Sequence, residues 1–144
     1  MNLAQILADP ALKARIISDS AQILEEEVAS KRGLRATALK AGFKAFKRLS
    51  PGIIESAFSK LLPAFAPAID PFYERGKASG DVHKYFRDQR APIADALLAV
   101  TDMKANSAAN RVMVKIYRSL RGPARGYVMD AVPRISALIV RYED

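Results

Sequence analysis

Apolar residues recur along most of this chain every three or four positions, the spacing that places side chains on one face of an α-helix. The clearest run begins at Pro10, where Leu12, Ile16 and Ile23 share a face. Runs of this kind predict long helices over residues 10–31, 34–49, 107–121 and 123–142. Shorter helices are predicted after Asn2, after Pro51, after Asp81 and over 91–104.

Prolines mark where several of these helices should begin. Asp9-Pro10, Ser50-Pro51 and Gly122-Pro123 each place a residue suited to the N-cap before a proline. Proline is tolerated in the first helical turn because the amide that it lacks would have no partner there. Each pair therefore predicts a helix start.

A second group of prolines predicts the opposite. Pro63, Pro67 and Pro71 recur every four residues, and a proline inside a helix removes a hydrogen bond and clashes with the preceding turn. We expect broken or kinked turns between residues 62 and 73, a loop over 76–80, and a bend at Pro133.

The fold class follows from these elements and from composition. The chain has 144 residues, half of them hydrophobic, and no cysteine, so neither a disulfide nor a thiolate zinc site can staple the fold. Short β-branched runs at 112–117 and 137–142 could form strands, but each lies in a longer stretch of helical periodicity. The sequence predicts one all-α domain over 1–144, a compact bundle of six to eight helices, some kinked by proline.

Targeting and membrane signals are not predicted. Residues 1–10 lack the basic start of a secretory signal and meet Asp9 early. The longest uncharged stretch, 61–69, is interrupted by prolines and far shorter than the roughly 20 residues of a membrane span. We expect a cytoplasmic protein without a transmembrane segment.

The formal net charge of +8 gives the best sequence argument about function. Two basic stripes have helical spacing, and their members are Lys40, Lys44 and Lys47, and Arg111, Lys115 and Arg118. Such stripes could follow a phosphate backbone or an anionic lipid surface. The alternative is a pair of solvated helix faces, and Lys47 also suits a helix C-terminus because of the helix dipole.

The segment 121–127 adds a second candidate anion site. A helix beginning at Pro123 would expose free amides, with Arg121 and Arg125 beside them, as a pocket for one phosphate, sulfate or carboxylate. Alternatively the segment is a tight connection capped by Gly122, with the arginines paired to Asp130 or to the acidic C-terminus.

An apolar ligand site is the alternative to an anion site. Phe58, Phe65, Phe72 and Met113 could line a cavity for a lipid or another apolar molecule, although aromatic residues near prolines commonly fill the core.

Catalysis is not predicted. His83 is the single histidine; Asp81 or Asp88 could orient it, but no nucleophile is evident nearby, so we expect a structural histidine. The acidic run 25–27 and the pair Asp95 and Asp102 are expected to be solvated. We therefore predict no catalytic residue, no metal site and no cofactor.

The chain resembles an uncharacterised family of short helical proteins found in actinobacteria. The stretches that carry the resemblance are LRATALKAGFKAFKRLSPGI at 34–53, LLPAFAPAIDPFY at 61–73, ADALLAVTD at 94–102 and IYRSLRGPARGYVMDAVPR at 116–134. The resemblance implies an intracellular all-helical domain and supplies no activity, ligand or functional residue.

The leading functional prediction is a non-enzymatic binding or adaptor module whose basic faces contact an anionic partner: nucleic acid, an acidic lipid surface or an acidic protein. The alternative is a helical carrier of a lipid or another apolar ligand. A homo-oligomer is compatible with either prediction.

Overall fold

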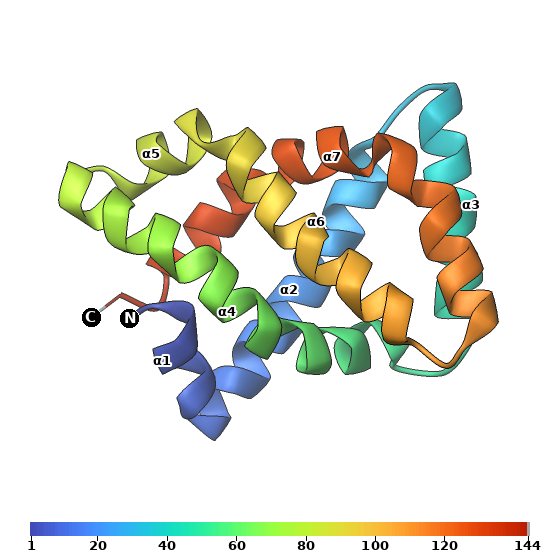
Figure 1. Cartoon of the computed structure of the whole chain (residues 1–144), viewed down its shortest axis with the longest axis horizontal. Coiled ribbons are helices and arrows are strands. Elements are labelled where there is room, and N and C mark those ends of the chain that lie inside the picture. The colour runs from blue at the N-terminus through green and yellow to red at the C-terminus, as the bar shows by residue number, and fades with distance from the viewer. Residues whose placement is uncertain (144) are drawn as a thin grey trace.

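Seven α-helices follow one another along residues 1–143, the part of the chain that this computed structural model describes (Figure 1). They are α1 (Leu3–Ala8), α2 (Pro10–Ser30), α3 (Leu34–Lys47), α4 (Ile53–Ser79), α5 (Val82–Asp88), α6 (Arg90–Ser107) and α7 (Arg111–Val140). These residues include no strand, which confirms the all-α prediction. Within the same residues, each helix is either too short or too polar to span a lipid bilayer.

Side-chain caps explain where several helices begin. The Asp9 carboxylate accepts hydrogen bonds from the amides of Ala11 and Leu12 at 2.9 and 3.3 Å, so α2 begins at Pro10 as predicted. The helix start predicted at Ser50-Pro51 lies two residues too early. There the chain turns through Gly52, whose φ of 69° is left-handed, and α4 begins at Ile53.

Of the broken or kinked turns predicted between residues 62 and 73, the broken turns are wrong, because α4 is continuous through Pro63, Pro67 and Pro71. All three prolines are exposed and recur on one side of the helix, where water can satisfy the carbonyls that lose a partner. The opposite side is packed into the core and holds the helix together. The loop predicted over 76–80 reduces to Gly80, at which α4 ends with a φ of 86°.

The prediction of two helices separated at Gly122-Pro123 is also wrong, because α7 runs without interruption from Arg111 to Val140. The hydrogen bond that Pro123 cannot donate would go to the carbonyl of Ser119, an exposed residue. The helix predicted to begin at 107 begins at Arg111 instead, after a break at 108–110, and the Asn110 side chain caps α7 by accepting from the Met113 amide at 3.0 Å.

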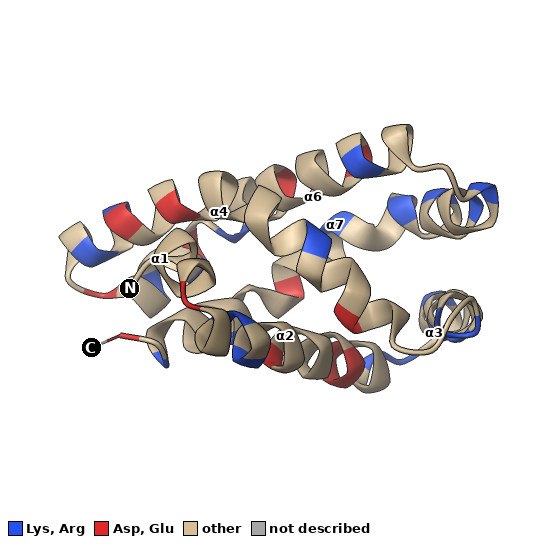
Figure 2. Cartoon of the chain, turned by 90° about the horizontal axis from the view of Figure 1, so that it is seen from below, with Lys and Arg blue, Asp and Glu red and all other residues tan. Residues whose placement is uncertain are grey.

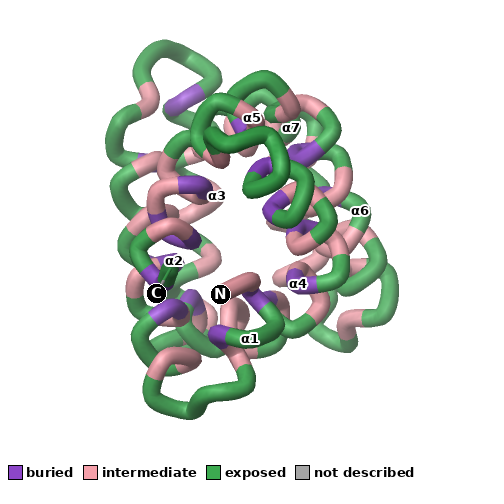
Figure 3. The backbone as a smooth tube through the Cα atoms, turned by 90° about the vertical axis from the view of Figure 1, so that its left-hand side faces the viewer, coloured by how far each residue is buried: buried purple, intermediate pink, exposed green. Residues whose placement is uncertain are grey.

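The hydrophobic core lies toward the end of the molecule that holds both chain termini (Figure 1). Its members are Leu3, Ile6, Ile16, Leu62, Ala66, Ile69, Tyr73, Phe86, Ile93, Val132, Leu138, Ile139 and Tyr142. Asp70 of α4 joins α1 to this core by accepting from the amides of Leu3 and Ala4 at 2.7 and 3.0 Å. Along the helices, buried positions alternate with exposed ones, as amphipathic packing requires (Figure 3).

The opposite end of the molecule, around α3, is packed less deeply. Ala36 is the one buried residue of α3, and the predicted ridge of Leu39, Phe43 and Phe46 is half-buried. This end carries the groove described below.

Candidate binding groove

The lysine stripe on α3 is partly neutralised by α2. Lys47 Nζ lies 2.7 Å from Glu25 Oε1, so this lysine is engaged within the fold. Lys40 and Lys44 are exposed, and no carboxylate of residues 1–143 lies within ion-pair distance of either. Two members of the stripe therefore remain available to an external anion.

The predicted anion pocket at 121–127 is not formed, because its amides lie inside α7 and not at a helix N-terminus. Both arginines instead bind carboxylates of α6 through two nitrogens each. Arg121 contacts Asp102 at 2.9 and 3.1 Å, and Arg125 contacts Asp95 at 2.8 and 3.3 Å. Hydrogen bonds from Arg121 and Tyr117 lower the pKa of the Asp102 carboxyl. The expectation that Asp95 and Asp102 are merely solvated is thus wrong.

Arg111, Lys115 and Arg118 are exposed, and within the described chain they have no acidic partner. Basic positions are concentrated at the end of the molecule where α3 and the first turns of α7 lie (Figure 2). Lys47 of the first stripe points to α2. No residue of either stripe lines the two pockets described below.

A groove of about 520 Å³ opens where the end of α3, the start of α4, the end of α6 and the start of α7 meet. Most of its lining is apolar, and the lining residues are Phe46, Ile53, Ser56, Ala57, Lys60, Leu61, Thr101, Lys104, Ala105, Ser107, Ala108, Ala109, Asn110, Met113, Val114 and Tyr117. Of the four predicted apolar-site residues, Met113 lines the groove. Phe58, Phe65 and Phe72 are instead packed, partly buried, against the core.

A hydrogen-bonded network joins α6 and α7 along one wall of the groove. The Tyr117 hydroxyl contacts both Asp102 Oδ1 and, at 2.7 Å, Thr101 Oγ1. Because a carboxylate only accepts, the Tyr117 proton goes to Asp102, and the Thr101 hydroxyl donates to Tyr117 or to the Leu98 carbonyl. Burial and the hydrogen bond to Asp102 raise the pKa of Tyr117. The tyrosine is therefore a fixed neutral part of this wall.

Charge in the groove comes from two lysines, Lys60 of α4 and Lys104 of α6. The lining contains no carboxylate, and neither lysine lies within ion-pair distance of a carboxylate in residues 1–143. The sequence prediction missed both lysines and Tyr117, because helix ends far apart in the sequence form the groove. The one local signal was the run of small residues at 105–109.

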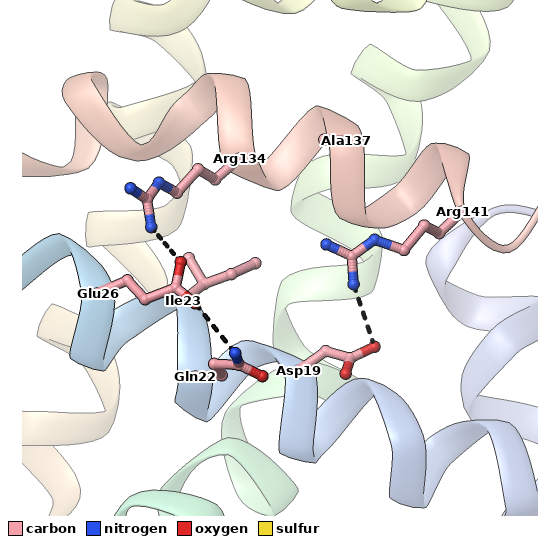
Figure 4. A pocket seen from close by; sticks show the side chains of 7 residues that line it. All are labelled: Asp19, Gln22, Ile23, Glu26, Arg134, Ala137 and Arg141. Carbon is pink, nitrogen blue, oxygen red and sulfur yellow. Dashed lines mark hydrogen bonds and ion pairs between the residues drawn. The ribbon is translucent and has the colours of Figure 1, made fainter.

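A second, smaller pocket of about 190 Å³ lies between α2 and α7 (Figure 4). Its two arginines face carboxylates, with Arg134 bound to Glu26 and Arg141 Nη1 3.8 Å from Asp19 Oδ2. Arg134 Nε also lies 3.0 Å from Glu27, so the acidic run 25–27 is ion-paired rather than only solvated. The charges of the two arginines in this pocket are therefore balanced by carboxylates of α2, and the pocket offers no unpaired charge to a ligand.

His83 has a hydroxyl partner that the sequence did not indicate. Its Nδ1 lies 3.1 Å from Oγ of the buried Ser136, which also lies 3.0 Å from the Pro133 carbonyl. The tautomer of the ring decides whether Ser136 donates to His83 or accepts from it. Asp81 instead caps α5, and Asp88 pairs with Lys84, so neither orients the ring. Across residues 1–143, no group of three or more His, Asp or Glu side chains is placed to hold a metal ion.

Comparison with known protein families gives a match over nearly the whole chain. Residues 3–143 match the model of a family described as a family of unknown function, DUF6918. Neither a curated protein nor a solved structure matches the chain. The actinobacterial range of the predicted resemblance stays a prediction. Because the match extends over nearly the whole chain, this protein belongs to the DUF6918 family of unknown function.

Proposed function

We propose that this protein is a non-enzymatic binding protein that holds the apolar part of a small molecule in the groove between α3, α4, α6 and α7. The observation that carries the proposal is the groove's volume of about 520 Å³ together with its apolar lining. Ligand sites in proteins are concave, mostly apolar and roughly 300–1,000 Å³ in volume. The groove meets all three conditions.

The chemistry of the lining supports binding rather than catalysis. Of the groove's titratable groups, Tyr117 is neutral and already donates its proton, and the two lysines have no adjacent carboxylate. General acid–base or nucleophilic catalysis needs paired groups with matched protonation states. The proposal therefore assigns no reaction to this site.

Groove filling tests the proposal. Ala105→Trp places a large ring on the lining, whereas Ala99→Trp adds the same ring at an exposed position of α6 outside the lining. We expect wild type to bind a neutral apolar fluorescent probe, A105W to bind it at least tenfold more weakly, and A99W to match wild type. Circular dichroism verifies that each variant is folded. Equal probe binding by all three proteins would reject the groove as the site.

A second candidate function keeps the predicted contact with a polyanion. The favouring observation is that five exposed basic residues, Lys40, Lys44, Arg111, Lys115 and Arg118, have no acidic partner in the described chain. Contacts to phosphates release counterions, so affinity for nucleic acid or acidic vesicles should fall steeply as salt rises.

Two double variants separate this surface from a general effect of net charge. Lys44→Gln with Lys115→Gln removes two charges from the basic end, and Lys13→Gln with Arg87→Gln removes two elsewhere. The first pair should weaken polyanion binding and lower its salt dependence more than the second. Equal effects would indicate attraction to overall charge without a defined surface.

A further inference from the structure

We propose that the occupant of the groove is a single-chain amphiphile with an anionic head, whose charge is held by Lys60 and Lys104. This inference rests on the proposed function, and it adds the chemical class of the ligand. The juxtaposition that carries it is two lysines without a carboxylate partner in the described chain, on a mostly apolar groove.

Lys60 and Lys104 line the groove without a carboxylate partner among the described residues, unlike several basic residues that lie at contacts between helices. Where Lys31, Arg121 and Arg134 lie at helix contacts, each one has a carboxylate within about 3 Å. Lys60 and Lys104 lie on helices that pack together and line the same groove, but they have no such partner in residues 1–143. Two like charges facing one apolar space repel each other, and an anion bound between them removes that repulsion.

The carboxylates of the described chain do not neutralise Lys60 or Lys104. The carboxylate that contacts the groove wall is Asp102, and its oxygens accept from Arg121 and from Tyr117. No described carboxylate lies within ion-pair distance of either lysine. Both lysines are exposed, so the head group of an anionic ligand can pair with them without displacing an internal carboxylate.

The wall that Tyr117 and Thr101 form has no proton left to donate to a neutral polar head. The Tyr117 proton is donated to Asp102, and the Thr101 proton is donated within the network, to Tyr117 or to a main-chain carbonyl. Neither hydroxyl has a second proton for an alcohol or an ester. The lysine ammonium groups carry three donors each, and these favour a charged acceptor such as a carboxylate or a phosphate.

The size of the groove is that of a small-molecule site. Its volume of about 520 Å³ lies within the range of roughly 300–1,000 Å³ that such sites occupy. A flexible alkyl chain also suits a lining of scattered aliphatic residues, among them Ile53, Leu61 and Val114. We therefore commit to a lipid-like small anion and treat a second copy of the chain as an outcome of the test.

The experiment compares three 12-carbon competitors of the neutral apolar probe at low salt. Dodecanoate is anionic, 1-dodecanol is neutral and dodecyltrimethylammonium is cationic, while the chain is the same. We expect dodecanoate to bind at least fivefold more tightly than 1-dodecanol and the cation to bind most weakly. In Lys60→Gln with Lys104→Gln, dodecanoate should lose this advantage while the affinity for 1-dodecanol is unchanged. Lys40→Gln with Lys44→Gln, outside the groove, should retain it.

The outcomes separate this inference from the proposed function. If dodecanoate and 1-dodecanol displace the probe equally well, the anionic head is wrong and the apolar groove stands. If no alkyl compound displaces the probe, both fail. If light scattering shows a dimer that A105W dissociates, the occupant is a second copy of the chain and the inference is overturned. Lengthening the alkyl chain of the ligand by one methylene should tighten binding about fourfold if the tail lies in the groove.

Discussion

Gly42 of α3 and Leu120 of α7 lie in such close contact that a Cβ on the glycine would come within 2.9 Å of both δ carbons of the leucine. The contact lies at the crossing of two helices at the loosely packed end of the molecule. Because α3 buries a single residue, Ala36, this crossing is a principal attachment of α3 to the rest of the fold.

A double-mutant cycle measures that contact. Ala is favoured over Gly inside a helix by about 1 kcal/mol, but overpacking a contact costs roughly 1–3 kcal/mol. We expect Gly42→Ala alone to leave the free energy of unfolding unchanged or lower it by up to about 2 kcal/mol. In a Leu120→Ala background, the same change should raise it by about 1 kcal/mol, as measured by urea unfolding. Purely additive effects would contradict the close approach.

The prolines of α4 lead to a second prediction. Pro67 is exposed and lies in the middle of α4, where it cannot donate to the Pro63 carbonyl. Restoring that hydrogen bond with Pro67→Ala should outweigh the added freedom of the unfolded chain and raise the free energy of unfolding by about 1–2 kcal/mol. If denaturant unfolding shows that Pro67→Ala lowers the free energy of unfolding, the shape that the prolines give α4 is needed for this helix to cover the core.

These prolines also show which parts of the fold the sequence could predict. The start at Pro10 depends on Asp9, a local cap whose effect can be inferred from neighbouring residues. The continuity of α4 and α7 depends instead on tertiary packing of one face and on exposure of the carbonyls that proline leaves unpaired. The spacing of residues in the sequence shows neither the tertiary packing nor the exposure of these carbonyls. The sequence therefore does not predict that Pro67 and Pro123 lie inside continuous helices.

The candidate site was predictable to a smaller extent. Met113 was identified because its apolar side chain suits a cavity, but Lys60, Lys104 and Tyr117 become neighbours only when four helix ends meet. The pairing of Arg121 with Asp102 was missed for the same reason, since 19 residues and a turn separate them. Charge counts therefore overstated how much of the basic surface is free.

The Asp102–Arg121 pair should contribute to acid sensitivity. The folded-state pKa of Asp102 is lowered, so its contribution to stability is present above the unfolded pKa of about 3.9 and is lost as pH falls through the folded value. Because the Asp102 side chain is 40% exposed, solvent screens the pair, and Asp102→Asn should cost only about 0.5–1 kcal/mol at pH 7. Urea unfolding should show this difference shrinking below pH 4. In an Arg121→Gln background, D102N should cost less; an unchanged cost would assign the effect to Tyr117 instead.

Tyr142 should affect the stability of the fold at alkaline pH. Its side chain is buried and donates to Asp19 Oδ2 at 2.9 Å, and burial together with this hydrogen bond raises the pKa of Tyr142 to about 12. The folded state therefore keeps a proton that the unfolded chain loses near pH 10, so stability is full below pH 10 and declines between pH 10 and 12.

Tyr142→Phe removes both the hydrogen bond and the titrating group. The variant should be less stable than wild type at pH 8, and the difference in the free energy of unfolding should narrow as pH rises toward 12. Tyr127→Phe is the matched control, because Tyr127 is half-buried and its ring is contacted by Lys31. The narrowing with pH should be larger for Y142F than for this control. If the free energy of unfolding of Y142F stays below that of wild type by the same amount from pH 8 to 12, the titration of Tyr142 does not contribute to the alkaline transition. Loss of packing near Asp19 would then account for the lower stability of Y142F.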